Sequence, residues 1–150
     1  MEHLQNLKIA VDFDGTLVEH EYPKIGKDIL FAFETLKELQ KHGALLILWT
    51  IRTGQELDEA VEYCRNKGIE FYAVNKNYPE EESNDSVSRK INADVYIDDK
   101  NVGGFPGWST IWQHLSLYDE MEKEMARQLN RRKSLFRKLF RRLQGRDKSL

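Results

Sequence analysis

The sequence predicts an α/β protein built on an open, mostly parallel sheet with flanking helices. Two observations carry this prediction. Short apolar segments alternate with segments of helical spacing between residues 7 and 118, and strands that alternate with helices in this way form parallel sheets. One apolar segment, ALLILW at residues 44–49, contains no polar residue, which is typical of a strand covered on both faces.

The expected elements follow one another in a regular order. Strands are predicted over residues 7–11, 44–49, 69–74 and 94–97, and together they would make a Rossmann-like sheet. Helices are predicted over residues 29–41, 55–67 and 109–118, where apolar residues are spaced along one face. Residues 75–88 are polar and predict a loop, with a short helix over residues 85–91.

Composition excludes two classes of protein. Apolar residues make up 40% of the 150-residue chain and the mean hydropathy is −0.65, so we expect one packed core and no integral membrane protein. The longest purely apolar run has six residues, whereas a transmembrane helix needs about 18. The N-terminus lacks the pattern of a signal peptide, and the single Cys64 cannot form an internal disulfide. These features predict a cytoplasmic protein.

Charge divides the chain into two regions, although the formal net charge is only −2. Residues 127–150 contain ten basic residues and one acidic residue, whereas residues 1–126 contain 13 basic and 24 acidic residues. We therefore expect an acidic domain over residues 1–120 and a basic helical tail over residues 121–150, with separate functions.

Polar side chains follow all four predicted strands. The carboxyl ends of parallel strands meet at one edge of the sheet, which is where open α/β folds bind ligands. We therefore expect these side chains to converge on one site. They are Asp12 and Asp14, Thr50 and Arg52, Asn75 and Lys76, and Asp98 and Asp99.

The aspartates of this set predict a metal ion. Side chains two positions apart in extended chain project in the same direction, so Asp12 and Asp14 would lie together. With Asp98 and Asp99 they would form a cluster whose like charges raise one another's pKa unless a cation is bound. Mg²⁺ is the usual ion for oxygen ligands beside phosphate, and Gly15 would let the backbone turn sharply at this point.

These segments resemble the motifs of the haloacid dehalogenase superfamily of phosphatases and phosphotransferases. IAVDFDGTLV matches the DxDxT motif in full, LILWT supplies the threonine after the second strand, and VYIDD supplies the acidic pair. The segment Ser88-Arg89-Lys90 offers the basic residue of the third motif, with Arg89 or Lys90 in that role. The resemblance covers roughly residues 7–118 and extends, more narrowly, to a small capless branch.

The resemblance implies a Mg²⁺-dependent phosphatase that acts through an aspartyl-phosphate. Asp12 would be the nucleophile, and Asp14 would protonate the leaving oxygen and later activate water. Thr50 and Lys90 would neutralise the phosphoryl oxygens. The metal ligands would be Asp12, the backbone carbonyl of Asp14, Asp99, and Asp98 either directly or through water.

No cap domain is expected over this site. The two positions where such a domain is inserted hold only about 12 and about 15 residues, and independent folding needs roughly 40. The open site predicts a phosphorylated small molecule, or a phosphate exposed on a larger molecule, as substrate; alternatively, a second subunit of a homo-oligomer covers the site. His20 is a candidate contact to the leaving group, and Arg52 and Lys76 are candidates for binding a second anionic group.

The basic tail predicts an amphipathic helix. Phe136, Leu139, Phe140 and Leu143 are spaced along one helical face, and basic residues fill the rest. Such a helix suits a membrane surface, which would make the protein peripheral, and nucleic acid is the competing partner. An oligomerisation helix, or a solvated tail that folds back on the acidic domain, stays open.

Two functions follow from these predictions. The first is hydrolysis of phosphomonoesters, with phosphotransfer left open. The second is recognition of a phosphorylated partner with little catalysis, in which the tail is an adaptor for a membrane or nucleic acid.

Overall fold

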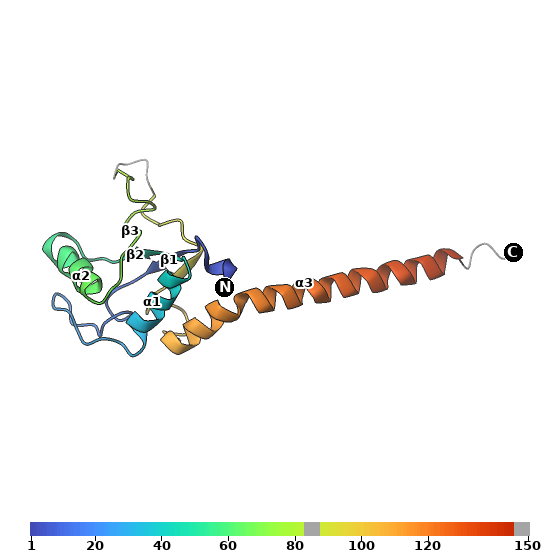
Figure 1. Cartoon of the computed structure of the whole chain (residues 1–150), viewed down its shortest axis with the longest axis horizontal. Coiled ribbons are helices and arrows are strands. Elements are labelled where there is room, and N and C mark those ends of the chain that lie inside the picture. The colour runs from blue at the N-terminus through green and yellow to red at the C-terminus, as the bar shows by residue number, and fades with distance from the viewer. Residues whose placement is uncertain (83–87, 146–150) are drawn as a thin grey trace. The chain divides into compact units, whose positions relative to one another are not determined.

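The computed structural model describes the backbone of residues 1–82 and 88–145 (Figure 1), and the side chains of these residues except 118–123, 126 and 136–145. The chain divides into two compact units, Met1–Leu115 and Ser116–Leu150. The first unit holds the sheet and its helices. The second is helical through Gly145.

The described residues form a four-stranded sheet in which every pairing is parallel. The order is β3-β2-β1-β4, and the strands are β1 (Lys8–Val11), β2 (Leu45–Leu48), β3 (Ala73–Val74) and β4 (Val95–Ile97). In the pairings of β1, Val11 lies opposite Leu48 on one side and opposite Ile97 on the other. The predicted open, parallel α/β fold is confirmed, and the carboxyl ends of β1, β2 and β4 lie side by side.

The helices of the described chain begin and end at different residues from those predicted. They are the short 3₁₀ helix Glu2–Leu4 and the helices α1 (Ala32–Lys41), α2 (Gly54–Asn66) and α3 (Trp108–Gly145). Helix α1 starts at residue 32 rather than 29 because Phe31 has a left-handed backbone (φ 65°) and the Ile29 N–H donates to the Leu17 carbonyl.

Two other predicted boundaries were wrong. Strand β3 is limited to Ala73–Val74, because the chain leaves α2 through a turn in which the Ile69 N–H donates to the Cys64 carbonyl. Helix α3 does not end near residue 118 but continues to Gly145. The short helix predicted over residues 85–91 falls partly outside the described residues, and residues 88–91 are not helical.

The core of the first unit lies on both faces of the sheet. Leu46 and Leu48 pack with α1 and α2 residues on one face, and Ile47 packs with Ala73 and Ile91 on the other. This explains why the predicted strand at residues 44–49 has no polar position. Cys64 is fully buried in the larger cluster, and burial raises the pKa of its thiol to about 12, so it packs as a small apolar residue.

The first turn of α3 belongs to this core. Trp108 is 1% exposed, and its indole Nε1–H donates to the Thr16 carbonyl over 2.7 Å. Ile111 and Leu115 are also buried. Trp108 therefore anchors the loop that follows β1.

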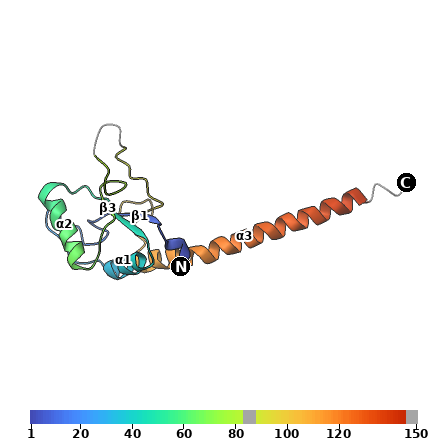
Figure 2. The same ribbon diagram turned by 45° about the horizontal axis from the view of Figure 1, so that its top comes forward.

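Farther along, α3 continues as one unbroken ribbon into the second unit (Figure 2). The described large apolar side chains there, Leu117, Met125, Leu129 and Leu135, are exposed. Phe136, Leu139, Phe140 and Leu143, which carry the predicted apolar stripe, lie outside the described side chains. Within the described residues, no helix combines the length and the apolar character needed to cross a membrane.

Candidate active site

Three carboxylates meet at the carboxyl ends of two neighbouring strands. Asp12 follows β1 and Asp98-Asp99 follow β4, and the Asp12 N–H donates to the Ile97 carbonyl over 2.9 Å. One oxygen from each carboxylate lies within 4.8 Å of the other two. This arrangement of oxygen ligands could hold a hard divalent cation such as Mg²⁺. Asp14, the fourth predicted member, is not part of the group.

The carboxylate of Asp12 has an unusual affinity for protons. Its pKa is raised from 3.8 to about 6, chiefly by burial and also by the charges of Asp98 and Asp99, against hydrogen bonds that lower it. One of those bonds comes from the Thr16 hydroxyl, which donates to Asp12 Oδ2 over 3.2 Å. A cation beside Asp12 would favour the ionised form.

Gly15 lies where the segment that follows β1 comes close to Asp99, which follows β4. Its φ is 84°, and a Cβ at this position would lie 2.5 Å from Asp99 Oδ2. Both the positive φ and the missing side chain therefore exclude any other residue without local rearrangement. The predicted turn at the glycine of the DxDGT sequence is found here.

Lys100 is a charged neighbour of the cluster that was not anticipated. Its Nζ lies 2.6 Å from Asp99 Oδ2, and its backbone N–H donates to Asp98 Oδ1 over 2.7 Å. The side chain is 77% exposed, so the ammonium group can move away when a cation binds. Its position directly after the acidic pair is the one signal in the sequence that could have identified it.

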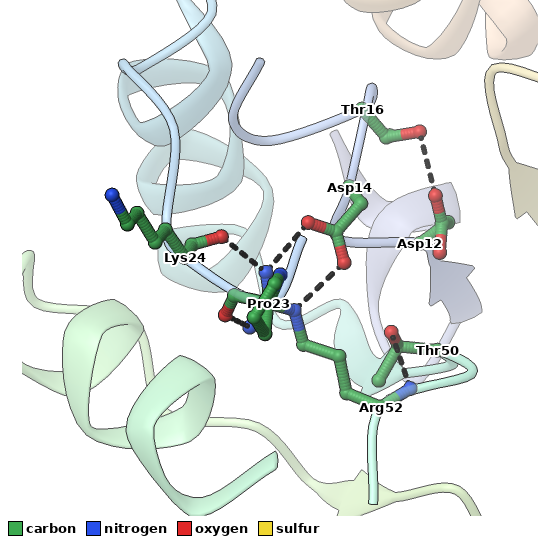
Figure 3. A network of polar contacts seen from close by, with 7 residues as sticks. All are labelled: Asp12, Asp14, Thr16, Pro23, Lys24, Thr50 and Arg52. Atoms are coloured by element: carbon green, nitrogen blue, oxygen red, sulfur yellow. Dashed lines mark hydrogen bonds and ion pairs between the residues drawn. The ribbon is translucent and has the colours of Figure 1, made fainter. Parts of the chain in front are cut away.

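Asp14 is held by a buried arginine (Figure 3). Arg52 Nε donates to Asp14 Oδ2 and Arg52 Nη2 donates to Asp14 Oδ1, each over 2.7 Å. The side chain of Arg52 is 0% exposed and that of Asp14 is 5% exposed. Hydrogen bonding to Asp14 raises the pKa of Arg52 above its ordinary value. The two side chains form a bidentate buried ion pair.

The same guanidinium also binds the loop that follows the DxDGT sequence. Arg52 Nη1 donates to the Pro23 carbonyl over 2.9 Å, and Nη2 donates to the Lys24 carbonyl over 2.7 Å. Its Cζ lies 4.9 Å from the ring centre of Phe13 and 5.2 Å from that of Tyr22. Arg52 was predicted to contact a substrate; in this conformation it has no exposed surface for one and binds Asp14 instead.

Thr50 lies at the end of β2, as predicted, and is fixed by its neighbours. Its N–H donates to Asn75 Oδ1 over 2.8 Å, and its hydroxyl oxygen accepts from the Arg52 N–H over 3.2 Å. Asn75 follows β3 with a left-handed backbone (φ 52°). Asn75 therefore supports the loop that carries both Thr50 and Arg52.

The remaining predicted residues do not join the acidic cluster in this conformation. Lys90 is exposed, and its Nζ lies 5.4 Å from the Tyr96 ring centre. Lys76 Nζ donates to the Pro79 carbonyl, and His20 is exposed in the loop after Val18. Their predicted contacts with a substrate stay predictions.

Comparison with known proteins gives one informative relative. No family model matches the chain, and no curated protein matches it. The solved structure of a conserved protein from Bacteroides thetaiotaomicron is 56% identical in sequence, with a TM-score of 0.70. The match covers 75% of this chain and 91% of the other. The chain therefore belongs to the same family as that Bacteroides protein.

Proposed function

We propose that the protein is a Mg²⁺-dependent phosphomonoester hydrolase that acts through an aspartyl-phosphate. The observation that supports this proposal most directly is the group formed by Asp12, Asp98 and Asp99 at the carboxyl ends of adjacent strands. Four segments that resemble haloacid dehalogenase motifs give the group its chemical interpretation.

In the proposed reaction, an oxygen of Asp12 forms a bond to phosphorus while the bond from phosphorus to the ester oxygen breaks. Asp14 gives a proton to the departing oxygen, and afterwards takes one from the water that hydrolyses the acyl phosphate. Thr50 and Lys90 are the proposed donors to the phosphoryl oxygens.

The proposed Mg²⁺ ligands are Asp12, Asp98 and Asp99, together with the backbone carbonyl of Asp14. A divalent ion at such a site supplies positive charge that offsets the charge of the phosphoryl oxygens. A cation bound at Asp99 would repel the Lys100 ammonium group, whose Nζ lies 2.6 Å from Asp99 Oδ2.

Metal removal tests this proposal. Phosphate release from a panel of phosphomonoesters should be abolished by EDTA and restored by excess Mg²⁺. Asp99→Asn should need a higher Mg²⁺ concentration for half-maximal rate, by about 10-fold, in the range of losses seen when metal sites are weakened. Asp58→Asn, a matched change at an exposed position of α2, should leave the Mg²⁺ dependence unchanged. Full activity in EDTA would remove the metal from the proposal.

For the second unit we propose binding to an anionic membrane surface. Leu129 and Leu135 are exposed on α3, and so are the nearby basic residues Arg127, Arg131, Arg132 and Lys133. Apolar and basic side chains on one helix match a bilayer interface, which offers both an acyl boundary and anionic headgroups. Nucleic acid would use the charges but not the exposed leucines.

Vesicle co-sedimentation separates these partners. The full chain should pellet with vesicles of mixed phosphatidylglycerol and phosphatidylcholine and not with phosphatidylcholine alone. Leu129→Asp should weaken pelleting, whereas Arg65→Glu on α2 should not. Unchanged pelleting of Leu129→Asp, together with tight binding of a DNA or RNA oligonucleotide, would favour nucleic acid.

A further inference from the structure

Arg52 joins two parts of the molecule that the sequence separates widely. Its Nε and Nη2 bind both oxygens of Asp14, 38 positions earlier, and its Nη1 and Nη2 bind the carbonyls of Pro23 and Lys24. Figure 3 shows the Asp14 carboxylate turned toward this guanidinium and the Asp12 carboxylate turned toward Thr16. One planar group therefore determines where Asp14 points and where the segment 22–24 lies.

The environment of Arg52 leaves it little freedom to do anything else. The side chain is 0% exposed, and every guanidinium nitrogen donates to Asp14 or to a backbone carbonyl. Phe13 and Tyr22 lie against it at centroid distances of 4.9 and 5.2 Å. Its backbone is held as well, because the Arg52 N–H donates to the Thr50 hydroxyl oxygen.

We propose that Arg52 is a positioning residue, which fixes the carboxylate of Asp14 for proton transfer and ties that carboxylate to the segment Tyr22–Lys24. This role rests on the proposed phosphatase function, in which Asp14 protonates the leaving oxygen. Arg52 does not touch the substrate. Each Asp14 oxygen accepts one bond from Arg52 and keeps a second lone pair. In the proposed reaction that lone pair holds the proton that Asp14 gives to the leaving oxygen, so Arg52 is not displaced.

The chemistry of the leaving group makes this role measurable. An ester with a poor leaving group needs proton donation as its bond to phosphorus breaks, whereas an ester with a good leaving group does not. A carboxylate that is present but badly oriented therefore slows the first kind of ester selectively. A merely structural role for Arg52 would slow both kinds equally.

Arg52→Lys is the variant that tests the positioning role. Lysine keeps the positive charge but lacks the planar fork that grips two carboxylate oxygens and two carbonyls together. We expect kcat/KM for phenyl phosphate to fall about 100-fold, the lower range of general acid catalysis. For 2,4-dinitrophenyl phosphate, which presents a similar ring, we expect a fall of less than about fivefold, because its leaving group needs no proton. Arg65→Lys, in the exposed Arg65–Glu62 pair, is the matched control and should change neither rate.

The outcomes separate this inference from the proposed function. If the wild-type protein hydrolyses neither ester in Mg²⁺, the phosphatase function fails and the positioning role fails with it. If the wild-type protein is active and Arg52→Lys loses both activities to the same extent, or loses neither, the positioning role alone is overturned.

Binding of Mn²⁺ to the acidic cluster reports whether Arg52→Lys is folded. If Arg52→Lys does not fold, a second variant provides the test. Tyr22→Ala removes a half-exposed ring from the guanidinium and leaves the ion pair with Asp14 in place. If the segment 22–24 is coupled to Asp14 through Arg52, this variant should also lose more activity on phenyl phosphate than on the dinitrophenyl ester. An equal loss on the two esters would contradict the coupling.

Discussion

The two compact units differ in the exposure of their leucines. In Met1–Leu115 the core leucines of α1 and β2 are buried, and Leu36, Leu39 and Leu48 are each 0% exposed. In Ser116–Leu150 the described leucines Leu117, Leu129 and Leu135 are 47%, 54% and 67% exposed. The first unit therefore has a core that can position a site, whereas the described leucines of the second unit are exposed.

Charge divides the chain in the same way. The acidic excess of residues 1–126 includes the three aspartates that meet beside β1 and β4, so part of it is concentrated at one site. The basic excess of residues 127–150 is spread along the chain, and the described basic side chains among them are exposed. A substitution among these three aspartates should therefore affect one site, whereas the loss of one basic side chain in the second unit removes a small share of its charge.

The largest expected difference between the units is catalytic. Asp12→Asn should lower phosphatase turnover at least about 1,000-fold, roughly 4 kcal/mol in activation free energy, because an amide cannot form the aspartyl-phosphate. Arg131→Gln, in the second unit, should change turnover less than about twofold. Phosphate release at saturating substrate and Mg²⁺ measures both. Near-normal turnover of Asp12→Asn would contradict the proposed nucleophile.

The next difference concerns stability. Leu36→Ala should lower the free energy of unfolding by about 2–5 kcal/mol, because it leaves a cavity in a packed core. Leu129→Ala, an identical change at an exposed position, should stay within about 0.5 kcal/mol. Urea unfolding followed by circular dichroism compares the two variants. Equal destabilisation would mean that the second unit buries Leu129 in solution.

The smallest expected effect depends on pH. The pKa of Asp12 is raised from 3.8 to about 6 in the folded protein, so the metal-free folded state binds more protons than the unfolded state between these values. The contribution of Asp12 to the free energy of unfolding is therefore fully present below pH 3.8 and is lost as the pH rises through about 6. Mg²⁺ competes with that proton, and it should raise the melting temperature more at pH 7 than at pH 5. Equal shifts of the melting temperature by Mg²⁺ at pH 5 and pH 7 would contradict this role of Asp12. So would an unchanged pH dependence of the free energy of unfolding in Asp12→Asn.

Much of the first unit could be predicted because its signals are local. Apolar runs and helical spacing located the four strands and the first two helices, and the parallel topology then placed Asp12 beside Asp98 and Asp99. The start of β3 and the start of α1 could not be predicted. Both depend on backbone conformation at single residues, such as the left-handed Phe31.

The ion-pair partner of Asp14 could not be predicted from the sequence, for a different reason. The spacing of Asp12 and Asp14 suggested that both would face a metal, but Asp14 binds Arg52, which is 38 positions away. That pairing depends on the path of the loop through Pro23 and Lys24, whose carbonyls complete the arginine site. A sequence pattern shows that Arg52 follows Thr50, but not that a distant loop turns it inward.

The edges of the sheet have a consequence for how the protein behaves when it is concentrated. The two edge strands, β3 and β4, have only two and three residues. Short edge strands present few unpaired backbone groups to a second chain. Crowding many copies together should therefore not extend the sheet from one molecule to the next, and association between copies would have to involve side chains.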